Sequence, residues 1–434
     1  MQFLNLFTTK KGLSKIRTPI IPMKILFLSH YFPPEVNAPA SRTYEHAKYW
    51  VQECGVSVSV ITNHPNHPRG VLYPGYENRW FTKEEMDGIE IQRVKTYLAP
   101  NSGFRRRILN YLFYMVAAVI AGIRGSKPDV LVATSPQFFC AVAGYLLSKI
   151  KRCPFVFELR DLWPESIVAV GAMRPGMVLR IIEKLELCLY RHSDLIIALT
   201  DAFKKNLIKR GVPAANIRVI KNGVDLSFFS PRGAPEALKV EIGTQGKFVV
   251  TYIGTIGMAH AIDKIVAVAE QLKNNNSLLF LIVGEGSEKD AIQELIQYKG
   301  IQNIKVLPGV SKDQVRDYYA LSDINLVTLK KAELFGTVIP SKIFEIMAMA
   351  RPILSTVDGE CRQIIEEAGS GIFVEPENVK QMATILLKLS KQPDILEAMS
   401  QNGRRFVERY FSRTQLAHHY LELLKDCFQY STYS

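Results

Sequence analysis

Short runs of consecutive apolar residues recur along the chain, and each is followed by a turn and a segment with helical spacing of its apolar positions. Continuous Val, Ile, Leu and Phe runs are typical of parallel strands that are buried on both faces. Their alternation with helices predicts a doubly wound α/β architecture. The predicted strands cover residues 25–28, 56–61, 89–94, 130–133, 155–158, 195–199, 217–220, 248–253, 278–283, 304–307, 324–327, 352–355 and 372–374.

The strands form two series, separated by a segment at residues 227–246 that contains two Pro and three Gly. A chain of 434 residues is long enough for two or three domains of roughly 100–200 residues each. We therefore expect two Rossmann-like domains that face each other across a cleft. The expected parts are an N-terminal extension (1–22), a first domain (23–225), a second domain (226–411) and a final helix (412–434) that packs back on the first domain.

The net charge of +13 is unevenly distributed. Residues 1–220 hold 30 Lys and Arg against 16 Asp and Glu, whereas residues 221–434 hold 24 against 25. Such an asymmetry indicates an anionic partner of the first half. The longest apolar run, residues 108–123, follows Arg105, Arg106 and Arg107. It is shorter than the ~20 residues that a membrane span needs, so it predicts either a core helix or a helix that lies on a membrane surface.

The six cysteines stand far apart and form no CxxC pair. This pattern argues against a zinc site and a disulfide framework, and it fits a reducing compartment. We accordingly expect no metal and no cofactor. At the N-terminus the basic residues follow the apolar stretch, the reverse of the order in a secretory signal.

Candidate site residues of the first domain follow its predicted strands, because ligands of such sheets bind at the carboxyl ends. The loop after strand 25–28 contains Asn37, Ser41 and Arg42. Ser41 is a candidate N-cap, and exposed amides together with Arg42 would suit an anion or sugar hydroxyls. Strand 155–158 runs into Arg160 and Asp161, which could counter negative charge and accept hydroxyl hydrogen bonds, or could form only a capped turn with a local ion pair.

In the second domain, glycines follow two strands and would let the backbone approach a phosphate or a nucleoside. No GK[ST] sequence follows them, so P-loop chemistry is not expected. These glycines are Gly254, Gly257, Gly284 and Gly286.

The segment 329–348 contains the strongest signal. Pro340 at a helix start, with Ser341 and Lys342 in the first turn, predicts an anion site built from free amides, the helix dipole and one ammonium. Glu345 lies one turn further and could accept both hydroxyls of a ribose. The alternative is a capped helix with an i,i+3 ion pair between Lys342 and Glu345.

Together these residues resemble glycosyltransferase family 4, in particular the branch that builds bacterial O-antigen, capsule and exopolysaccharide units. The resemblance covers nearly the whole chain from Met23. It is carried by HYFPPEVNAPASR, FELRDLWPES, IKNGVD, YIGTIG, IVGEGSEK, PGVSKDQV and IPSKIFEIMAMARPIL. It implies the GT-B fold and the retaining transfer of a sugar from a nucleotide diphosphate to a growing, often lipid-linked, saccharide, without an assigned carboxylate nucleophile.

The resemblance also implies roles for individual residues. Glu345 would bind the ribose, the backbone near Gly309 and Val310 the base, and Lys342 with the Ser341 amide the diphosphate. Lys330 and Arg160 are further candidates for the diphosphate. The acceptor would bind to the loop with Asn37, Ser41 and Arg42 and to the corner formed by Arg160 and Asp161, which are the catalytic candidates.

The chain departs from the family pattern at several positions. Thr337 stands where the family has the first Glu of its Glu-x7-Glu pair. Thr255 and His260 replace a frequent Arg and Lys, and Arg160 replaces a usual His. The positive partners of the diphosphate must therefore come from other positions.

Two other functions remain open at this point. A nucleotide-sugar 2-epimerase can share the fold, and a basic nucleic-acid-binding protein would explain the charge but lacks basic motifs interleaved with aromatics. We interpret the basic first half as attraction to the anionic inner face of the cytoplasmic membrane and to a lipid-linked acceptor. Arg105, Arg106 and Arg107 are the predicted membrane contact of a cytoplasmic, peripheral enzyme.

Overall fold

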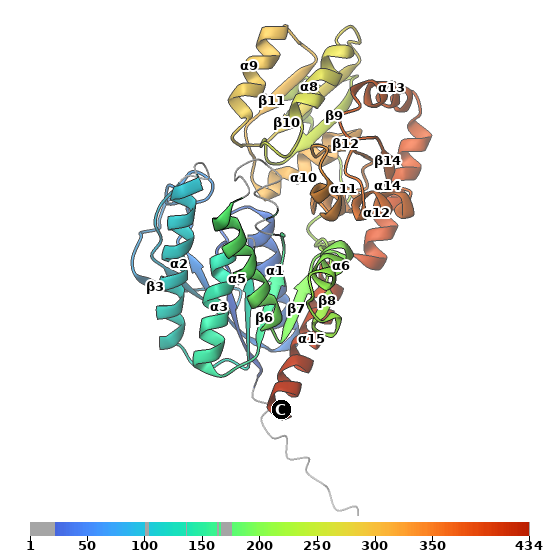
Figure 1. The fold of residues 1–434 in the computed structure, drawn as a ribbon. Coiled ribbons are helices and arrows are strands. Elements are labelled where there is room, and N and C mark those ends of the chain that lie inside the picture. Colours follow the sequence, from blue (N-terminus) through green and yellow to red (C-terminus); the bar gives the residue numbers. More distant parts are fainter. Residues whose placement is uncertain (1–21, 100–103, 136, 163–164, 166–175, 434) are drawn as a thin grey trace, which may run out of the picture.

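A computed structural model of the chain describes residues 22–99, 104–135, 137–162, 165 and 176–433, with the backbone alone at residues 104, 105, 178 and 431–433. Two α/β domains lie one above the other, and a long C-terminal helix returns from the second domain to the first (Figure 1). Nearly all of the expected N-terminal extension lies outside the described residues, as do Trp163, Pro164 and Ser166 of the RDLWPES sequence.

The first domain contains an eight-stranded sheet in the order β3-β4-β2-β1-β5-β6-β7-β8. All neighbouring strands are parallel except β3 and β4. Its strands are β1 (Lys24–Leu28), β2 (Ser57–Asn63), β3 (Phe81–Met86), β4 (Ile89–Val94), β5 (Val130–Thr134), β6 (Phe155–Leu159), β7 (Leu195–Ala198) and β8 (Ile217–Val219). Its helices are α1 (Ala38–Cys54), α2 (Phe104–Arg124), α3 (Phe138–Lys151), α5 (Met177–Arg191), α6 (Asp201–Lys209) and the short η1 (Ala214–Asn216).

The second domain contains a six-stranded parallel sheet in the order β11-β10-β9-β12-β13-β14. Its strands are β9 (Phe248–Ile253), β10 (Leu278–Val283), β11 (Ile304–Leu307), β12 (Ile324–Val327), β13 (Ile353–Ser355) and β14 (Gly371–Phe373). Its helices are α7 (Glu236–Ile242), α8 (Ile262–Gln271), α9 (Lys289–Lys299), α10 (Lys312–Leu321), η2 (Glu333–Thr337), α11 (Lys342–Ala348), α12 (Glu360–Ala368), α13 (Val379–Leu389) and α14 (Pro393–Tyr410). The last helix is α15 (Arg413–Tyr433).

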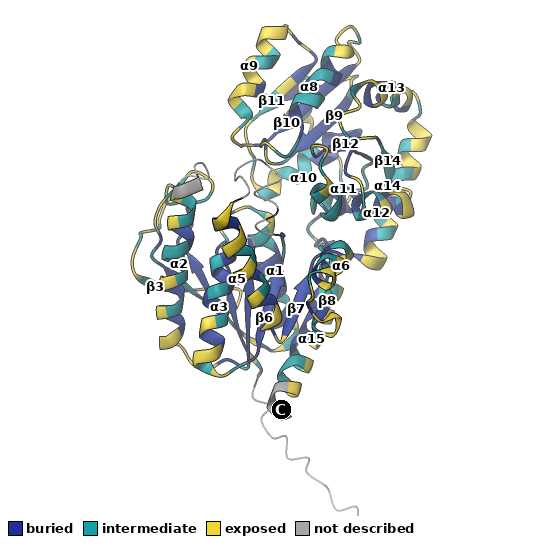
Figure 2. Cartoon of the chain, viewed as in Figure 1, coloured by how far each residue is buried: buried dark blue, intermediate teal, exposed yellow. Residues whose placement is uncertain are grey.

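Both faces of the first sheet are covered, which explains the uninterrupted apolar runs of its central strands. On one face α1 and α15 pack together, and Trp50 Nε1 donates a hydrogen bond to the Ala417 carbonyl oxygen at 2.8 Å. On the other face α2, α3 and α5 bury side chains such as Tyr114, Phe138 and Leu189. Figure 2 shows the strands as the most deeply buried layer of the domain.

Every predicted strand is present, but the first sheet has one more at its edge. Strand β3 has the sequence FTKEEM, pairs antiparallel with β4 and contains no buried residue. An edge strand pairs on one side only and can be polar, so a search for continuous apolar runs cannot find it.

The prediction that Ser41 caps helix α1 was wrong. The cap is Asn37, whose Oδ1 accepts a hydrogen bond from the Ala40 amide at 2.9 Å. The helix begins at Ala38 and has Pro39 in its first turn, where the fixed φ of proline and its missing N–H are both tolerated. Ser41 therefore lies inside the helix.

Polar contacts join the two domains. Thr200 Oγ1 donates to the Thr337 carbonyl oxygen at 3.0 Å, and the Ala202 amide donates to Glu360 at 2.6 Å. These contacts connect the start of α6 with η2 and the start of α12. They hold the two sheets with the carboxyl ends of their strands facing each other.

Candidate active site

The carboxyl ends of both sheets face a cleft of about 570 Å³. The first domain contributes the β1–α1 loop and the residues after β6, and the second domain contributes the residues after β9 together with α10 and α11. The cleft brings together these sequence-predicted residues: Asn37, Ser41, Arg160, Asp161, Gly254, Ser341, Lys342 and Glu345.

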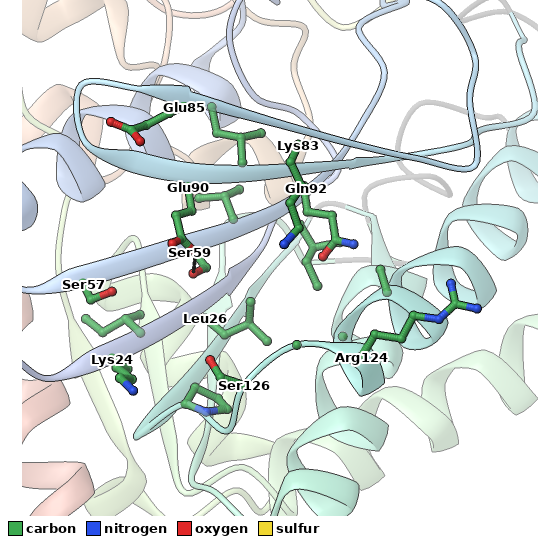
Figure 3. A pocket seen from close by; sticks show the side chains of 18 of the residues that line it. Lys24, Leu26, Ser57, Ser59, Lys83, Glu85, Glu90, Gln92, Arg124 and Ser126 are labelled. Carbon is green, nitrogen blue, oxygen red and sulfur yellow. Dashed lines mark hydrogen bonds between the residues drawn. The ribbon is translucent and has the colours of Figure 1, made fainter.

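A second pocket, of about 630 Å³, lies at the opposite, amino edge of the first sheet (Figure 3). Its floor is a polar stretch of β2 and β4 that includes Ser57, Ser59, Glu90 and Gln92, and the end of α2 lies beside it. Ser59 donates a hydrogen bond to Glu90 at 2.9 Å. Because alternate residues of these strands are polar, this part of the sheet faces solvent. It contains none of the predicted site residues.

Lys342 is the first residue of α11, and its ammonium lies 4.1 Å from the centroid of the Tyr252 ring. Burial lowers the pKa of Lys342 to about 8, although Glu345 acts against this shift. Gly254 follows β9 with φ +145°, and a Cβ there would lie 2.6 Å from Lys342 Nζ. A larger residue at position 254 would therefore have a strained backbone and would crowd the end of the Lys342 side chain.

Glu345 lies one turn after Lys342 on the same side of α11. The Tyr319 hydroxyl donates a hydrogen bond to Glu345 Oε2 at 3.0 Å, and burial raises the pKa of the carboxyl group. Among the ion pairs of the described residues, none joins Lys342 to Glu345. The alternative prediction of an i,i+3 ion pair between Lys342 and Glu345 is therefore wrong. Both side chains line the cleft.

On the opposite wall, Arg160 fixes the β1–α1 loop. Its guanidinium donates to the carbonyl oxygens of Ala38 and Pro39 at 2.9 and 3.0 Å. Burial, together with the nearby Arg42 and Arg413, lowers the pKa of Arg160 to about 9. Asp161 lines the cleft beside it.

Asn37 combines a structural contact with a free donor. Its Oδ1 caps α1, while its Nδ2 is buried and has no hydrogen-bond partner among the described residues. Since Asn37 lines the cleft, this amide can donate to a ligand hydroxyl.

Arg42 does not line the cleft. Its side chain is 1% exposed and lies 2.8 Å from Glu158 Oε1. The guanidinium also donates to the carbonyl oxygens of Ile220 and Lys221, both at 3.0 Å. With its donors occupied in this way, Arg42 supports the chain segment between the domains, and this geometry does not favour the predicted contact with an acceptor.

Several predicted donor-site residues also lie outside the lining of the cleft: Gly257, Gly284, Gly286, Gly309, Val310 and Lys330. A Cβ on Gly284 would lie 1.8 Å from the Gly254 carbonyl oxygen, and one on Gly286 would lie 2.1 Å from the Ile256 carbonyl oxygen. These two glycines allow the chain after β9 and after β10 to pack closely.

The predicted membrane contact lies at the start of α2. Arg106 is exposed, Arg107 donates to the Tyr111 hydroxyl at 3.0 Å, and the side chain of Arg105 lies outside the described part of the structure. Within the described chain, residues 106–124 form a helix that is long and apolar enough to cross a membrane, with 39% of it buried.

Sequence reasoning missed four charged residues that line the cleft, namely Glu45, Asp225, Lys312 and Arg413. Glu45 of α1 lies 2.7 Å from Lys312 Nζ of α10 and 2.7 Å from Arg413 Nε of α15. Lys312 follows the Ser311 N-cap in PGVSKDQV, and a lysine directly after a cap residue is a signal in the sequence for a cation at a helix start. Glu45 and Arg413 carry no signal, because only folding brings α1 and α15 together.

His260 does not replace the positive charge that is frequent at its position in the family. Burial, with Lys342 nearby, lowers the pKa of His260 to about 4, so the imidazole is neutral near pH 7. Among the described residues, the cations that line the cleft are Lys342, Lys312, Arg160 and Arg413.

Comparisons with known proteins agree with this geometry. A model described as "Glycosyl transferase 4-like domain" matches residues 38–223, and one described as "Glycosyl transferases group 1" matches residues 236–406. The "Putative colanic acid biosynthesis glycosyl transferase WcaI" of Escherichia coli (strain K12) is 24% identical over 410 residues, which cover 92% of this chain and 99% of that protein.

Solved structures share the fold. Sucrose-phosphate synthase from Thermosynechococcus elongatus superposes with a TM-score of 0.74 at 15% identity, covering 94% of this chain and 99% of that one. Anabaena HepE in complex with UDP-glucose superposes with a TM-score of 0.70 at 16% identity, covering 93% and 100%. With both domains matched and the cleft between them, the chain belongs to the family 4 type of glycosyltransferases with the GT-B fold.

Proposed function

We propose that this glycosyltransferase moves a sugar from a nucleotide-diphosphate sugar to a saccharide acceptor, with retention, in the synthesis of a bacterial surface polysaccharide. The observation that carries this proposal is one cleft with Lys342 and Glu345 on one wall and Asn37 and Asp161 on the other. The name of the colanic acid relative and the UDP-glucose complex of the Anabaena protein support it.

The second domain would hold the donor. Glu345 would accept hydrogen bonds from the ribose hydroxyls, and Lys342 with the Ser341 amide would bind the diphosphate. The backbone near Gly309 and Val310 would contact the base. Ser341, Lys342 and Glu345 lie at or within α11, whereas Gly309 and Val310 precede α10 just outside the lining of the cleft, so the base would extend beyond the cleft.

Stabilisation of the leaving group would supply most of the catalysis. As the bond between the anomeric carbon and the diphosphate oxygen breaks, negative charge develops on that oxygen. A preplaced ammonium in a partly buried cleft interacts with this charge more strongly than water would. Asp161 would accept a hydrogen bond from the acceptor hydroxyl, and Arg160 would keep the loop of Asn37 in position.

The acceptor would bind to the first domain through Asn37, Ser41 and Asp161. The excess of basic residues in the first half of the chain supports an acceptor that is linked to an anionic lipid, at the inner face of the cytoplasmic membrane. The start of α2, with Arg105, Arg106 and Arg107, is the proposed side of approach.

A panel of nucleotide sugars tests the reaction class. We expect one donor to raise the melting temperature of the protein, and NMR of the product to show a glycoside with the anomeric configuration of that donor. Conversion of the donor to its C2 epimer in the absence of any acceptor would instead identify a 2-epimerase. Salt-sensitive retention of nucleic acid on a filter, without nucleotide-sugar binding, would contradict the proposal.

The ribose contact predicts a loss of nucleotide affinity in Glu345→Gln. The amide keeps the size of the side chain but loses the charge that accepts both hydroxyls, so we expect binding of the nucleoside diphosphate to weaken by about 10- to 100-fold. Calorimetry with the diphosphate of the selected donor measures this. Tyr319→Phe, which removes only the hydroxyl that supports Glu345, should have a smaller effect. Unchanged affinity of Glu345→Gln would disprove the assignment.

A further inference from the structure

The outward faces of α2, α3 and α5 expose an unusual number of large apolar side chains. Of the 21 such exposed side chains in the described chain, nine lie on these three helices, which cover one face of the first sheet side by side (Figure 2). They are Leu109, Val116, Ile120, Ile123, Leu146, Ile150, Met177, Ile181 and Leu185.

The spacing of these residues shows a second apolar stripe on each helix. On α2 the exposed positions 109, 116, 120 and 123 follow the helical period, while Tyr114, Ala117 and Ala121 face the sheet. A helix that covers a sheet in a soluble domain normally has a polar outer face. The second stripe is not needed for the core, and an exposed apolar face of this kind marks an interaction surface.

The charges around these stripes have one sign. Helices α2 and α3 contain no Asp or Glu. On α5, Glu186 is buried and pairs with Arg210, so Glu183 is the one acidic residue near this surface on these helices. The exposed basic residues on or next to these helices include Arg106, Arg124, Lys149, Arg152, Arg180 and Lys184, and none of these six forms an ion pair with a described residue.

An aromatic residue adjoins the surface at α2. Trp80 is 54% exposed and stacks on Phe113 of α2 with ring centroids 5.9 Å apart. The ammonium of Lys95 lies 5.0 Å from the Trp80 ring. A partly exposed indole beside a cation is typical of side chains at the boundary between lipid tails and headgroups.

The surface also adjoins the cleft. Helices that follow parallel strands begin at the carboxyl edge of the sheet, the edge that faces the cleft. The N-terminal turns of α2 and α5, which contain Arg106, Leu109 and Met177, therefore lie at the cleft end of the surface. Figure 1 shows both helices on the first domain.

We propose that the outer faces of α2, α3 and α5 bind an anionic lipid bilayer, with the apolar stripes inserted at the level of the upper acyl chains and the basic residues against headgroup phosphates. This surface deepens the proposed membrane association, since it extends the contact from the arginines at the start of α2 to three helices. A second copy of the chain is a poorer occupant, because a symmetric contact would bring unneutralised basic residues together.

Vesicle flotation of the full-length protein tests this surface. Vesicles of phosphatidylcholine and phosphatidylglycerol should carry wild-type protein upward, and phosphatidylcholine vesicles should carry much less. Val116→Glu and Ile181→Glu each place a carboxylate on an exposed position, so they should fold normally and reduce binding by about tenfold or more. Val240→Glu is the matched control, because Val240 is 66% exposed on α7 in the other domain, and it should bind like wild type.

Equal flotation of all three variants, or no flotation of the wild type, would overturn the proposal. Sedimentation velocity adds a second readout: a wild-type dimer that Ile181→Glu dissociates would assign the surface to a second copy and would also overturn it. Because flotation needs no substrate, it is independent of the glycosyl transfer. Nucleotide binding measured on the same samples shows separately whether the proposed function holds.

Discussion

Replacing Lys342 by Met is expected to lower kcat by about 100- to 1,000-fold, the usual effect of removing one preorganised group that stabilises developing negative charge. The lysine is held over the Tyr252 ring at the bottom of the cleft, where Gly254 leaves room for it. Met keeps an unbranched side chain that is one atom shorter and removes the charge, so the fold should be unchanged. Initial rates at saturating donor measure the loss.

The pH dependence gives an independent check of the same group. Burial lowers the pKa of Lys342 to about 8, so the ammonium is lost as the pH rises through that value. We expect kcat/KM for the donor to fall above about pH 8, because this quantity reports the free enzyme. The corresponding decline in kcat should come at higher pH, since a bound diphosphate favours the charged lysine.

The matched comparison is Lys330→Met. Lys330 is the other lysine that the sequence places near the diphosphate, but it is exposed and does not line the cleft. Its variant should lose much less activity and should keep the alkaline decline of kcat/KM. Wild-type rates for Lys342→Met, or an alkaline decline that survives in it, would refute the role of Lys342.

The Arg42→Met variant is expected to destabilise the first domain by about 3–5 kcal/mol, because it leaves the buried carboxylate of Glu158 without its partner. Although burial opposes ionisation, Arg42 and Arg160 hold the pKa of Glu158 below its usual value. The stabilising effect of the pair is therefore present above the pKa of an unfolded glutamate, and it is lost as the pH falls through the lower pKa of Glu158 in the folded protein.

Urea unfolding followed by tryptophan fluorescence measures this effect selectively, because all three tryptophans, at positions 50, 80 and 163, belong to the first domain. Removing both partners in Arg42→Met/Glu158→Leu should recover most of the lost stability. Arg79→Met removes an exposed arginine that pairs with Glu77, and it should unfold close to wild type. A single Arg42→Met variant as stable as wild type would show that the pair is not required.

Much of the architecture could be predicted from the sequence. The runs of residues 248–253 and 278–283 become β9 and β10 with the same bounds, because a strand buried on both faces is largely apolar. Strand β3 could not be predicted in this way, since an edge strand meets no such requirement. The capping of α1 was misassigned because Ser41 and Asn37 are both suitable caps, and only the position of Pro39 in the first turn separates them.

The candidate site divides in a similar way. Ser341, Lys342 and Glu345 are close in sequence on one helix, so their spacing alone places them together. Arg42 has the same chemistry as a ligand-binding arginine. Its neighbours along the chain give no sign that it forms an ion pair with Glu158, which is more than a hundred residues away.

By itself the sequence determined two α/β domains, the family and the grouping of Ser341, Lys342 and Glu345 on one helix, because these depend on local patterns of apolar residues and on motifs within single loops and helices. The tertiary structure decided which charged side chains line the cleft, such as Lys342, and which form buried ion pairs away from it, such as Arg42 with Glu158. It joined Glu45 to Lys312 and Arg413 from three separate helices, and it aligned the apolar stripes of α2, α3 and α5 into one surface. These outcomes depend on contacts between residues that are distant along the chain, and such contacts exist only after the domains have folded and docked.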